Sequence, residues 1–439
     1  MSQKLIEYLE NKKILILGFG REGRSSYEYI RRFLPEKPLA IADKNPQTLE
    51  DSRVCVICGD GYLDCLGDFD IVLKSPGIPF RGVNIPQNTE ITCQTDLFLR
   101  FCECTTVGIT GTKGKTTTST LIYSILREAG LNAELIGNMG IPVFGKLDMP
   151  RDSVAVIEMS SHQLEFTHAS PHVSVLTNIW QEHLDHYNGG FEGYVNAKLN
   201  IARFQHENDF FIYDDESGST DAFDPCELTA AKRIAASHSD IAQDAFISGL
   251  AGINSHLMGE HNAQDIYFAV CAARCLGVDD EAAKRAIAGF AGIEHRMEKV
   301  GTYKGITFYN DCIATVPEAV RFAVDALKNT GTLIMGGKDR GISYDGFCDY
   351  LSEKKLPCVI GLPDTGHKIC SALTESGYDG MLIKAKDMDD AVMQAYAHTH
   401  GGMCCVLSPA ASSYNVYRNF EEKGRHYKSL VKKYGEAEE

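Results

Sequence analysis

Short apolar runs alternate along the chain with longer segments whose apolar residues recur at helical spacing. The apolar runs that we interpret as strands in the first half lie at residues 13–17, 39–42, 54–58, 70–73, 105–107, 153–157, 173–177 and 209–213. The helical patterns lie at residues 22–33, 117–128, 193–205, 259–276 and 279–290. Strands that alternate with helices are typical of parallel, doubly wound sheets. The pattern therefore predicts an α/β fold.

The same alternation resumes after residue 294, with strands at 306–309, 332–335 and 405–408 and a helix at 317–327. A chain of 439 residues is long enough for several domains. Breaks in the pattern near residues 101–104 and 294 suggest three, at 1–102, 103–294 and 295–439. All sheets are expected to be parallel.

Composition narrows the class of protein. Hydrophobic residues make up 44% and charged residues 23% of the chain, as in ordinary globular proteins. The net charge of −16 argues against nucleic-acid binding and against adhesion to an anionic membrane. No apolar run reaches the ~18 residues of a membrane span, and no signal peptide is recognisable. The fifteen cysteines are therefore expected to be reduced thiols in the cytoplasm, with Cys55 and Cys58 as buried strand residues and not a zinc half-site.

A glycine-rich segment between a strand and a helix predicts a phosphate site. It reads Gly108-Ile-Thr-Gly-Thr-Lys-Gly-Lys-Thr116, and it departs from the strict phosphate-loop pattern at Ile109. Successive backbone N–H groups at such a turn face an anion, with the helix N-terminus behind them. Lys115 would reach the β- and γ-phosphates, and the Thr116 hydroxyl would hold Mg²⁺. We interpret this segment as an ATP site.

A second glycine pattern lies near the N-terminus. Gly18-Phe-Gly20-Arg-Glu-Gly23 follows the first strand, and Asp43 ends the second strand. This is the pattern of a dinucleotide-binding unit and by itself suggests an NAD-dependent oxidoreductase. A nucleotide-sugar diphosphate satisfies the same geometry. Ser75 lies in the turn after a neighbouring strand, where loops line the ligand crevice of an open α/β sheet.

Three further positions carry candidate chemistry. Glu158 ends a buried strand beside the phosphate loop, where a second Mg²⁺ carboxylate is expected. The loop from Glu182 to His186 holds two acids and two histidines, which suits a metal site, substrate binding or a solvated loop. Lys198 lies one residue from an apolar helical stripe. Its charge would either snorkel to water or be desolvated with a lowered pKa.

Taken together and in order, the motifs resemble the Mur ligase family. They are Thr110–Thr116, Glu158-Met-Ser-Ser, Thr177-Asn-Ile, His183-Leu-Asp185, Gly259-x-His-Asn262, His295-Arg296, Tyr309-Asn-Asp311, Ala314-Thr315, Gly336-Gly337 and Leu407-Ser-Pro-Ala410. The segment ending in Asn419-Phe420-Glu-Glu-Lys-Gly424 is most like the member that adds D-glutamate. The resemblance covers nearly the whole chain.

The resemblance implies an ATP-dependent amide ligase of peptidoglycan precursor synthesis. The implied reaction joins D-glutamate to UDP-N-acetylmuramoyl-L-alanine through an acyl phosphate. The implied domains are a Rossmann-like domain that binds the UDP substrate, a central phosphate-loop ATPase-type domain, and a Rossmann-like C-terminal domain that binds the amino acid. The implied cofactors are ATP, two Mg²⁺ ions and a CO₂-derived carbamate on Lys198. We expect a monomer with no nucleic-acid partner and no membrane insertion.

The resemblance also implies residue roles. The catalytic residues would be Lys115, His183 and Lys198. ATP would meet Gly111, Thr112, Gly114, Lys115, Thr116, Thr117, Asn262, Arg296 and Asp311. The UDP substrate would meet Gly18, Gly20, Asp43, Ser75, Asn138 and His183, and glutamate would meet Thr315, Arg340, Ser413 and Phe420. Metal ligands would be Thr116, Glu158, His183 and Lys198 as its carbamate.

Four positions depart from the family pattern. Ile313 replaces a lysine, Asp265 an asparagine, Glu182 an aspartate and Arg340 a lysine. Three other interpretations therefore stay open: a relative that adds another amino acid such as L-glutamate, a nucleotide-binding relative without catalysis, and an NAD-dependent oxidoreductase.

Overall fold

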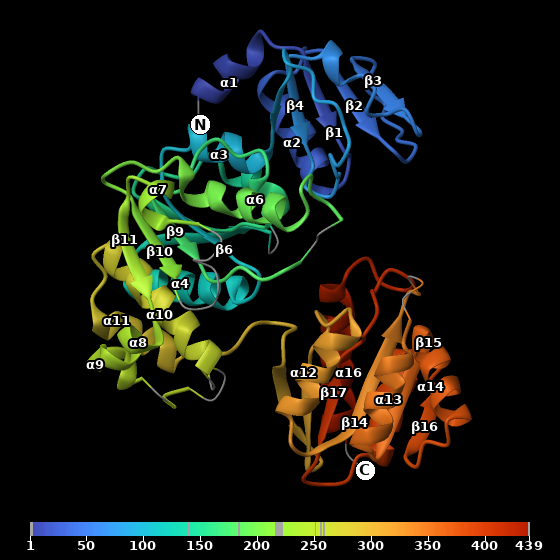
Figure 1. The fold of residues 1–439 in the computed structure, drawn as a ribbon. Coiled ribbons are helices and arrows are strands. Elements are labelled where there is room, and N and C mark those ends of the chain that lie inside the picture. The colour runs from blue at the N-terminus through green and yellow to red at the C-terminus, as the bar shows by residue number, and fades with distance from the viewer. Residues whose placement is uncertain are drawn as a thin grey trace. The chain divides into compact units, whose positions relative to one another are not determined.

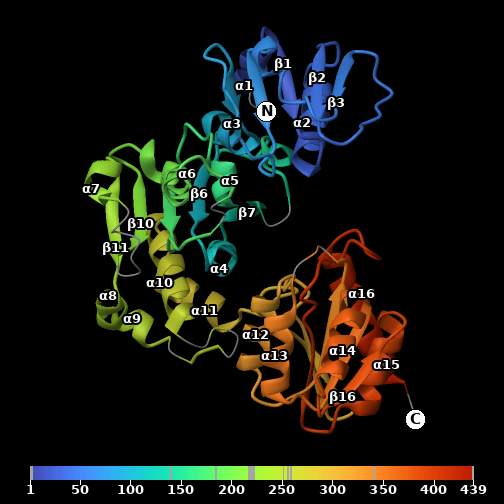
Figure 2. The ribbon, with the colours of Figure 1, turned by 45° about the vertical axis from the view of Figure 1, so that its right-hand side comes forward.

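The chain folds into two compact units, Met1–Phe290 and Ala291–Glu439, which Figures 1 and 2 show as ribbons. The computed structural model describes residues 3–138, 141–182, 185–215, 223–250, 252–254, 257, 260–339, 341 and 343–437. Three sheets organise these residues, two in the first unit and one in the second. The predicted α/β class is confirmed. Among the described helices, none combines the length and the apolarity needed to cross a bilayer.

The first sheet has five parallel strands in the order β3-β2-β1-β4-β5. They are β1 (Ile14–Leu17), β2 (Leu39–Asp43), β3 (Val54–Cys58), β4 (Ile71–Lys74) and β5 (Glu90–Thr92), with helices α1 (Gln3–Glu10), α2 (Arg21–Phe33) and α3 (Gln94–Phe101) and the short 3₁₀ helix η1 (Leu66–Asp68). The chain order reverses between β1 and β4, where Leu17 pairs with Lys74. The loops after these two strands therefore flank the crevice in which open α/β sheets bind ligands.

The predicted burial of the β3 thiols is wrong. Cys55 and Cys58 are both exposed, although the predicted strand is present. The reason is that β3 is the edge strand of its sheet and pairs only with β2. An alternating run predicts a strand but does not show how much of it other elements cover.

The second sheet has six parallel strands in the order β11-β10-β9-β6-β8-β7. They are β6 (Thr105–Thr110), β7 (Asn132–Gly137), β8 (Ser153–Glu158), β9 (Val173–Leu176), β10 (Phe210–Asp214) and β11 (Lys232–Ala236). The helices of this part are α4 (Lys115–Glu128), η2 (Val143–Lys146), α5 (Ser161–Leu164), α6 (Phe191–Arg203), α7 (Pro225–Leu228), α8 (His238–Gln243), α9 (Ala245–Ser248), α10 (Glu260–Cys275) and α11 (Asp280–Ala288). Helix α4 packs on α10 and α11, whereas α6 packs on β6 and β9.

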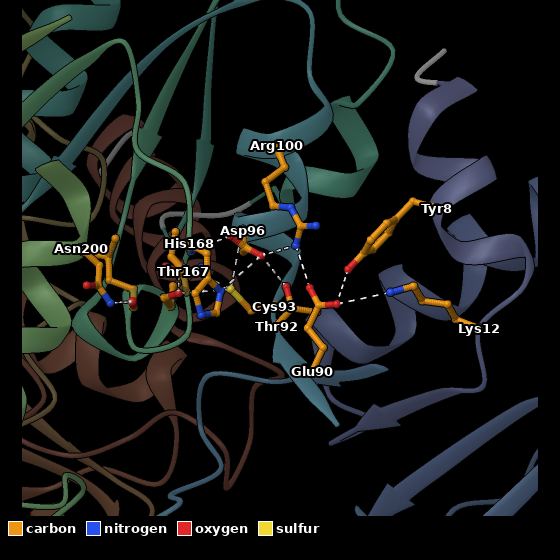
Figure 3. Close-up of polar contacts among 12 residues, drawn as sticks. Tyr8, Lys12, Glu90, Thr92, Cys93, Asp96, Arg100, Thr167, His168 and Asn200 are labelled. Carbon is orange, nitrogen blue, oxygen red and sulfur yellow. Dashed lines mark hydrogen bonds and ion pairs between the residues drawn. The ribbon is translucent and has the colours of Figure 1, made fainter. Parts of the chain in front are cut away.

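A polar network joins the first sheet to the second (Figure 3). At its centre is the fully buried Asp96 of α3, which accepts hydrogen bonds from Thr92 Oγ1 at 2.7 Å and from the backbone N–H of His168 at 2.7 Å. Arg100 donates to Asp96 at 3.2 Å and to Glu90 at 2.9 Å. Because His168 lies beyond α5, these bonds tie α3 to the central part of the unit.

The third sheet follows the order β12-β13-β17-β14-β15-β16. Its strands are β12 (Glu298–Tyr303), β13 (Ile306–Asn310), β14 (Thr330–Gly337), β15 (Cys358–Asp364), β16 (Met381–Lys384) and β17 (Cys404–Leu407). The helices are α12 (Pro317–Ala326), α13 (Asp345–Lys354), α14 (Thr365–Glu375), α15 (Met388–His398) and α16 (Phe420–Glu436).

The prediction of parallel sheets throughout is wrong at one edge of the third sheet. Strand β12 runs antiparallel to β13, and the other pairs are parallel. Lys304 and Gly305 connect the two strands with φ of 49° and 77°. Positive φ at both central residues is the geometry of a tight hairpin turn, which joins antiparallel strands.

Candidate active site

The predicted phosphate loop lies between β6 and α4. Gly111 has φ of 150°, and a Cβ there would collide with the Thr177 hydroxyl. Gly114 has φ of 82°, and a Cβ there would lie 2.5 Å from Asp265 Oδ1. Both positions therefore require glycine, because a side chain has neither the space nor the favoured backbone conformation. Figure 1 places this loop at the beginning of α4.

Residues after β9 hold the loop in shape. Asn178 accepts hydrogen bonds from the backbone N–H of Thr112, through its carbonyl, and of Lys113, through Oδ1, each at 2.9 Å. The sequence assigned no role to Asn178. Its position directly after a strand of the same parallel sheet is the signal that could have identified it, because the carboxyl ends of parallel strands share one edge.

Two lysines reach the same carbonyl of this loop. Lys115 Nζ donates to the carbonyl oxygens of Gly111 at 2.8 Å and Thr112 at 2.9 Å. Lys198 Nζ, from α6, donates to Gly111 at 2.7 Å and lies 4.8 Å from the centre of the Tyr194 ring.

The structure decides between the two interpretations of Lys198. Its side chain does not snorkel to water, since the residue is only 1% exposed. Burial lowers the pKa of Lys198 well below its usual value, and the nearby positive charge of Lys115 lowers that pKa further. The amine is therefore desolvated at the edge of the phosphate loop.

Glu158 brings together three of the predicted residues. It is 1% exposed at the end of β8 and pairs in register with Ile109 of β6. Its Oε2 accepts from Thr116 Oγ1 at 2.8 Å, and its Oε1 accepts from Asn138 Nδ2 at 2.7 Å. A carboxylate and a hydroxyl at a phosphate loop are oxygen ligands of the kind that Mg²⁺ prefers. The fourth predicted ligand, His183, lies outside the described residues.

Helices α4 and α10 supply the remaining nucleotide candidates of the first unit. Asn262 lies in its first turn, half-buried, and Thr117 is half-buried in the first turn of α4. Asp265 is buried and accepts a hydrogen bond from Thr118 Oγ1 at 2.9 Å. Asp265, where the family pattern has asparagine, therefore places a carboxylate beside Gly114, and the Thr118 hydroxyl of α4 hydrogen-bonds to that carboxylate.

The predicted residues of the first sheet shape a second glycine loop, after β1. Asp43 Oδ2 accepts from the backbone N–H of Phe19 at 2.7 Å, and Ser75 Oγ donates to the carbonyl oxygen of Gly18 at 2.9 Å. A Cβ at Gly20 would meet nothing within 4 Å. The loop is therefore closed on its strand side and open at Gly20, where a ligand could approach the backbone.

In the second unit, Asp311 follows β13 in a buried position. Its Oδ2 accepts from Ser408 Oγ at 2.7 Å, and its Oδ1 accepts from the backbone N–H of Met297 at 3.2 Å. Burial raises the pKa of Asp311 to about 6. Arg296 is exposed, and the backbone N–H of Ile313 donates to the carbonyl of His295 at 3.2 Å.

The structure describes three of the four predicted glutamate residues, Thr315, Ser413 and Phe420. Ser413 is buried, and neither its Oγ nor that of Ser412 has a hydrogen-bond partner among the described residues. Phe420 lies edge-on to His295 with ring centres 5.9 Å apart, and Thr315 is half-buried. Arg340 lies outside the described residues.

The sequence interpretation missed Lys423, three residues after Phe420 on α16. Its buried Nζ donates to the carbonyl oxygen of Gly336 at 2.7 Å, and burial lowers its pKa to about 8. Its helical spacing from Phe420 was a signal that both residues face the same side.

The fold and this site define a phosphate-loop nucleotide-binding enzyme of the α/β class. Residues 109–273 match the Mur ligase middle domain, and residues 295–411 match the Mur ligase, glutamate ligase domain. A UDP-N-acetylmuramoylalanine--D-glutamate ligase from Symbiobacterium thermophilum is 34% identical over 86% of this chain and 87% of its own length. The chain belongs to the Mur ligase family, as the motifs predicted.

A further relative and two solved structures also match nearly the whole length of this chain. A ligase with the same name from Acetivibrio thermocellus is 31% identical over 98% of this chain and 99% of its own. MurF from Acinetobacter baumannii has a TM-score of 0.57 at 15% identity, covering 98% of both chains. MurF from Thermotoga maritima, solved in complex with ADP, has a TM-score of 0.54 at 16% identity, covering 97% of both chains. These structures support the predicted three-domain α/β fold.

Proposed function

We propose that the protein is an ATP-dependent ligase that joins D-glutamate to UDP-N-acetylmuramoyl-L-alanine in peptidoglycan precursor synthesis. The observation that carries this proposal is the contact of Glu158 with both Thr116 and Asn138. It joins the phosphate loop, which suits ATP, to an amide from the neighbouring strand end, which suits the acceptor substrate. The relatives with this activity in their names span nearly the whole chain, which supports the assignment.

The chemistry begins with ATP on the phosphate loop. Lys115 would exchange the carbonyl oxygens of Gly111 and Thr112 for the β- and γ-phosphates, since an ammonium binds an anion more strongly than a neutral carbonyl. The L-alanyl carboxylate attacks the γ-phosphorus, ADP leaves and an acyl phosphate forms. The amino group of glutamate then attacks the acyl carbon, the amide forms, and inorganic phosphate and a proton leave. Positioning and charge neutralisation supply most of the catalysis of phosphoryl transfer.

The donor set fits magnesium. Thr116 and Glu158 would hold one of two ions, and His183 and the carbamate of Lys198 would be ligands of the other ion. When bound, the ions supply positive charge that stabilises the transferring phosphoryl group. The desolvated amine of Lys198 supports carbamate formation, because CO₂ reacts with the neutral amine.

The remaining roles are assigned by the same proposal. Gly18, Gly20, Asp43, Ser75 and Asn138 would bind the UDP substrate, with His183. The nucleotide would meet Gly111, Thr112, Gly114, Thr117, Asn262, Arg296 and Asp311, and glutamate would meet Thr315, Arg340, Ser413 and Phe420. The proposed domains are 1–102, 103–294 and 295–439, in a cytoplasmic monomer.

A coupled phosphate-release assay tests the function. Phosphate should appear only when ATP, Mg²⁺, UDP-N-acetylmuramoyl-L-alanine and D-glutamate are all present. Lys115→Ala should abolish turnover and leave the melting temperature nearly unchanged, because its half-buried side chain contributes little packing. L-glutamate in place of D-glutamate tests the related ligase, and tight NAD binding by calorimetry would support the oxidoreductase instead. Absence of phosphate with every amino acid would favour a nucleotide-binding protein without catalysis.

A further inference from the structure

Lys113, in the phosphate loop, combines a fixed backbone with an exposed side chain. Its carbonyl oxygen accepts hydrogen bonds from Thr177 Oγ1 at 2.5 Å and from Asn178 Nδ2 at 3.2 Å. Its backbone N–H donates to Asn178 Oδ1 at 2.9 Å. Its side chain, in contrast, is 65% exposed. The loop therefore holds the Cα atom of Lys113 in place, while its Nζ is accessible to a ligand from solution.

Part of the anion-binding capacity of this loop is used within the protein. In a phosphate loop, successive backbone N–H groups face the anion. Here the N–H groups of Thr112 and Lys113 both donate to Asn178, through its carbonyl oxygen and its Oδ1, at 2.9 Å each. These two donors are therefore not directed to a bound phosphate. The ammonium group of Lys113 is a further donor that the same segment offers to an anion.

The ammonium group of Lys113 forms an exposed ion pair with Glu182. Its Nζ lies 3.0 Å from Glu182 Oε1, and the Glu182 side chain is 35% exposed. An ion pair with this access to water contributes little to stability. The phosphates of ATP carry more negative charge than one carboxylate and accept strong, charge-assisted hydrogen bonds from an ammonium group. Exchange of the carboxylate for a phosphate oxygen is therefore favourable.

The ion pair lies at the same edge of the sheet as the other lysines of the site. Lys113 follows β6 and Glu182 follows β9, and these two strands are neighbours. Burial lowers the pKa of Lys198 most, followed by the positive charge of Lys115. Glu182 raises the pKa of this amine, and Lys113 lowers it. Both members of the ion pair are thus close enough to act on the amine that binds the Gly111 carbonyl.

We propose that Lys113 is a second phosphate-binding cation of the loop: when ATP binds, its ammonium group leaves Glu182 and donates a hydrogen bond to an oxygen of the γ-phosphate. This inference rests on the proposed ATP-dependent ligase. Glu182 directly precedes His183, which the proposed function assigns to the acceptor substrate, and the γ-phosphate is the group that faces the acceptor. No covalent bond of Lys113 changes, and its proton stays on the amine.

The proposal predicts that Lys113 distinguishes ATP from ADP, because ADP has no γ-phosphate. Loss of one hydrogen bond to a charged group should weaken the binding of Mg-ATP by about tenfold. The affinity for Mg-ADP should stay nearly unchanged. A merely structural contribution of the ion pair would instead change the affinity for both nucleotides alike.

Calorimetric titration of the full-length protein with Mg-ATP and with Mg-ADP tests the inference. The wild type, Lys113→Ala and Lys113→Arg are compared with the control Lys146→Ala, which removes an ion pair with Glu134 of similar length, 3.1 Å. The preference for ATP over ADP should fall about tenfold in Lys113→Ala, be largely kept in Lys113→Arg and be unchanged in Lys146→Ala. The melting temperature verifies that each variant is folded, since the backbone bonds of Lys113 remain.

Glu182→Gln tests the exchange of partners. It removes the carboxylate that competes with the γ-phosphate for Lys113, so Mg-ATP should bind more tightly than to the wild type. Loss of a negative charge near the phosphates would also favour ATP without any help from Lys113. In the Lys113→Ala background the gain from Glu182→Gln should therefore be smaller than in the wild-type background. An equal gain in both backgrounds would overturn the exchange.

The outcomes separate this inference from the proposed function. An unchanged preference for ATP over ADP in Lys113→Ala would overturn the role of Lys113 alone, as would an equal loss of affinity for both nucleotides. The ligase would in that case still release phosphate from ATP when both of its substrates are present. Absence of ATP binding by folded wild type would overturn the nucleotide site itself, and the proposed function with it.

Discussion

Lys115 and Lys198 donate hydrogen bonds to one and the same acceptor, the carbonyl oxygen of Gly111. Two ammonium groups at one carbonyl repel each other, and the more deeply buried of the two loses its charge more readily. Lys198 is the buried one, with a pKa lowered by desolvation and by Lys115. At this carbonyl the phosphate loop thus holds one cation for phosphate binding and one amine that is available for modification.

The first expectation concerns Lys198. Lys198→Ala should lower kcat by about 100-fold, because the carbamate would help to hold the metal ions that stabilise the charge of the transferring phosphoryl group. Short-chain carboxylic acids should restore part of the activity, since they replace the carbamate oxygen atoms. Lys284→Ala, at an exposed position of α11, is the matched control and should behave as the wild type. A fully active Lys198→Ala enzyme would contradict the carbamate, as would the lack of a carbamate signal after incubation with ¹³CO₂.

The second expectation concerns magnesium. Glu158→Gln keeps the size of the side chain and the contact with Thr116, but it removes the negative charge. The Mg²⁺ concentration that gives half-maximal phosphate release should rise by about 10- to 100-fold. Glu192→Gln, an exposed position on α6, should leave the Mg²⁺ dependence unchanged. If Glu158→Gln required no more Mg²⁺ than the wild type, Glu158 would not be a ligand.

The third expectation uses the single tryptophan of the chain, Trp180. It is 48% exposed, and its backbone N–H donates to Thr112 Oγ1 of the phosphate loop at 2.9 Å. Binding of Mg-ATP at the loop should therefore change the tryptophan fluorescence in a saturable way. Lys115→Ala should need much higher ATP concentrations for the same change. Calorimetric ATP binding without any fluorescence response would show that the nucleotide binds away from Thr112.

The fourth expectation concerns the Asp96 network of Figure 3. Asp96→Ala should lower the free energy of unfolding by about 2–5 kcal/mol, because it leaves the Thr92 hydroxyl and the His168 backbone N–H without their acceptor, while Arg100 keeps its contact with Glu90. Glu103→Gln is the control, since its ion pair with Arg151 is exposed and should contribute no more than about 1 kcal/mol. Urea unfolding measures both, and equal effects would contradict the structural role of Asp96.

The contact between Asp96 and His168 makes the stability of the protein depend on pH. Burial raises the pKa of Asp96, but hydrogen bonds from His168 and Thr92 outweigh it and leave the pKa below its usual value. The stability from Asp96 is therefore present above about pH 4 and is lost as pH falls through its folded pKa. The ion pair with Asp96, 3.9 Å between His168 Nδ1 and Asp96 Oδ2, raises the pKa of His168, so its contribution is full below about pH 6.5 and is lost as pH rises further. The difference in the free energy of unfolding between the wild type and Asp96→Ala should be largest between these two pH values.

The fifth expectation concerns the second unit. A Cβ at Gly424, on α16, would collide with His295 Nδ1 and lie 3.0 Å from Asn310 Nδ2. Gly424→Ala should therefore cost about 1–3 kcal/mol of stability through overpacking. At Gly401 a Cβ would meet nothing within 4 Å, so Gly401→Ala should stay within about 0.5 kcal/mol of the wild type. Equal melting temperatures for the two variants would contradict the close packing of α16 on His295.

Much of the site could be read from the chain because it depends on local features. Apolar runs and helical spacing predicted β1, β2, β4, β6, β8 and β9, and the helices α2 and α4, to within a few residues, but not α3 or α5. The phosphate loop and Glu158 were predicted because a strand, a glycine turn and a helix follow one another directly. The roles carried over from the family, such as those of Thr315 and Ser413, stay predictions. His183 and Arg340 lie outside the described residues.

Other properties were decided only when distant segments packed together. Sequence spacing left Lys198 either snorkelled or desolvated, and only the packing of α6 on β6 and β9 made it a buried amine beside Gly111. The exposure of Cys55 followed from the edge position of β3, and the partner of Lys113 proved to be Glu182, 69 residues away. Backbone conformation is set largely by neighbouring residues and their apolar pattern. Burial and pKa depend on which side chains and how little water surround a group, and those neighbours come from remote parts of the chain.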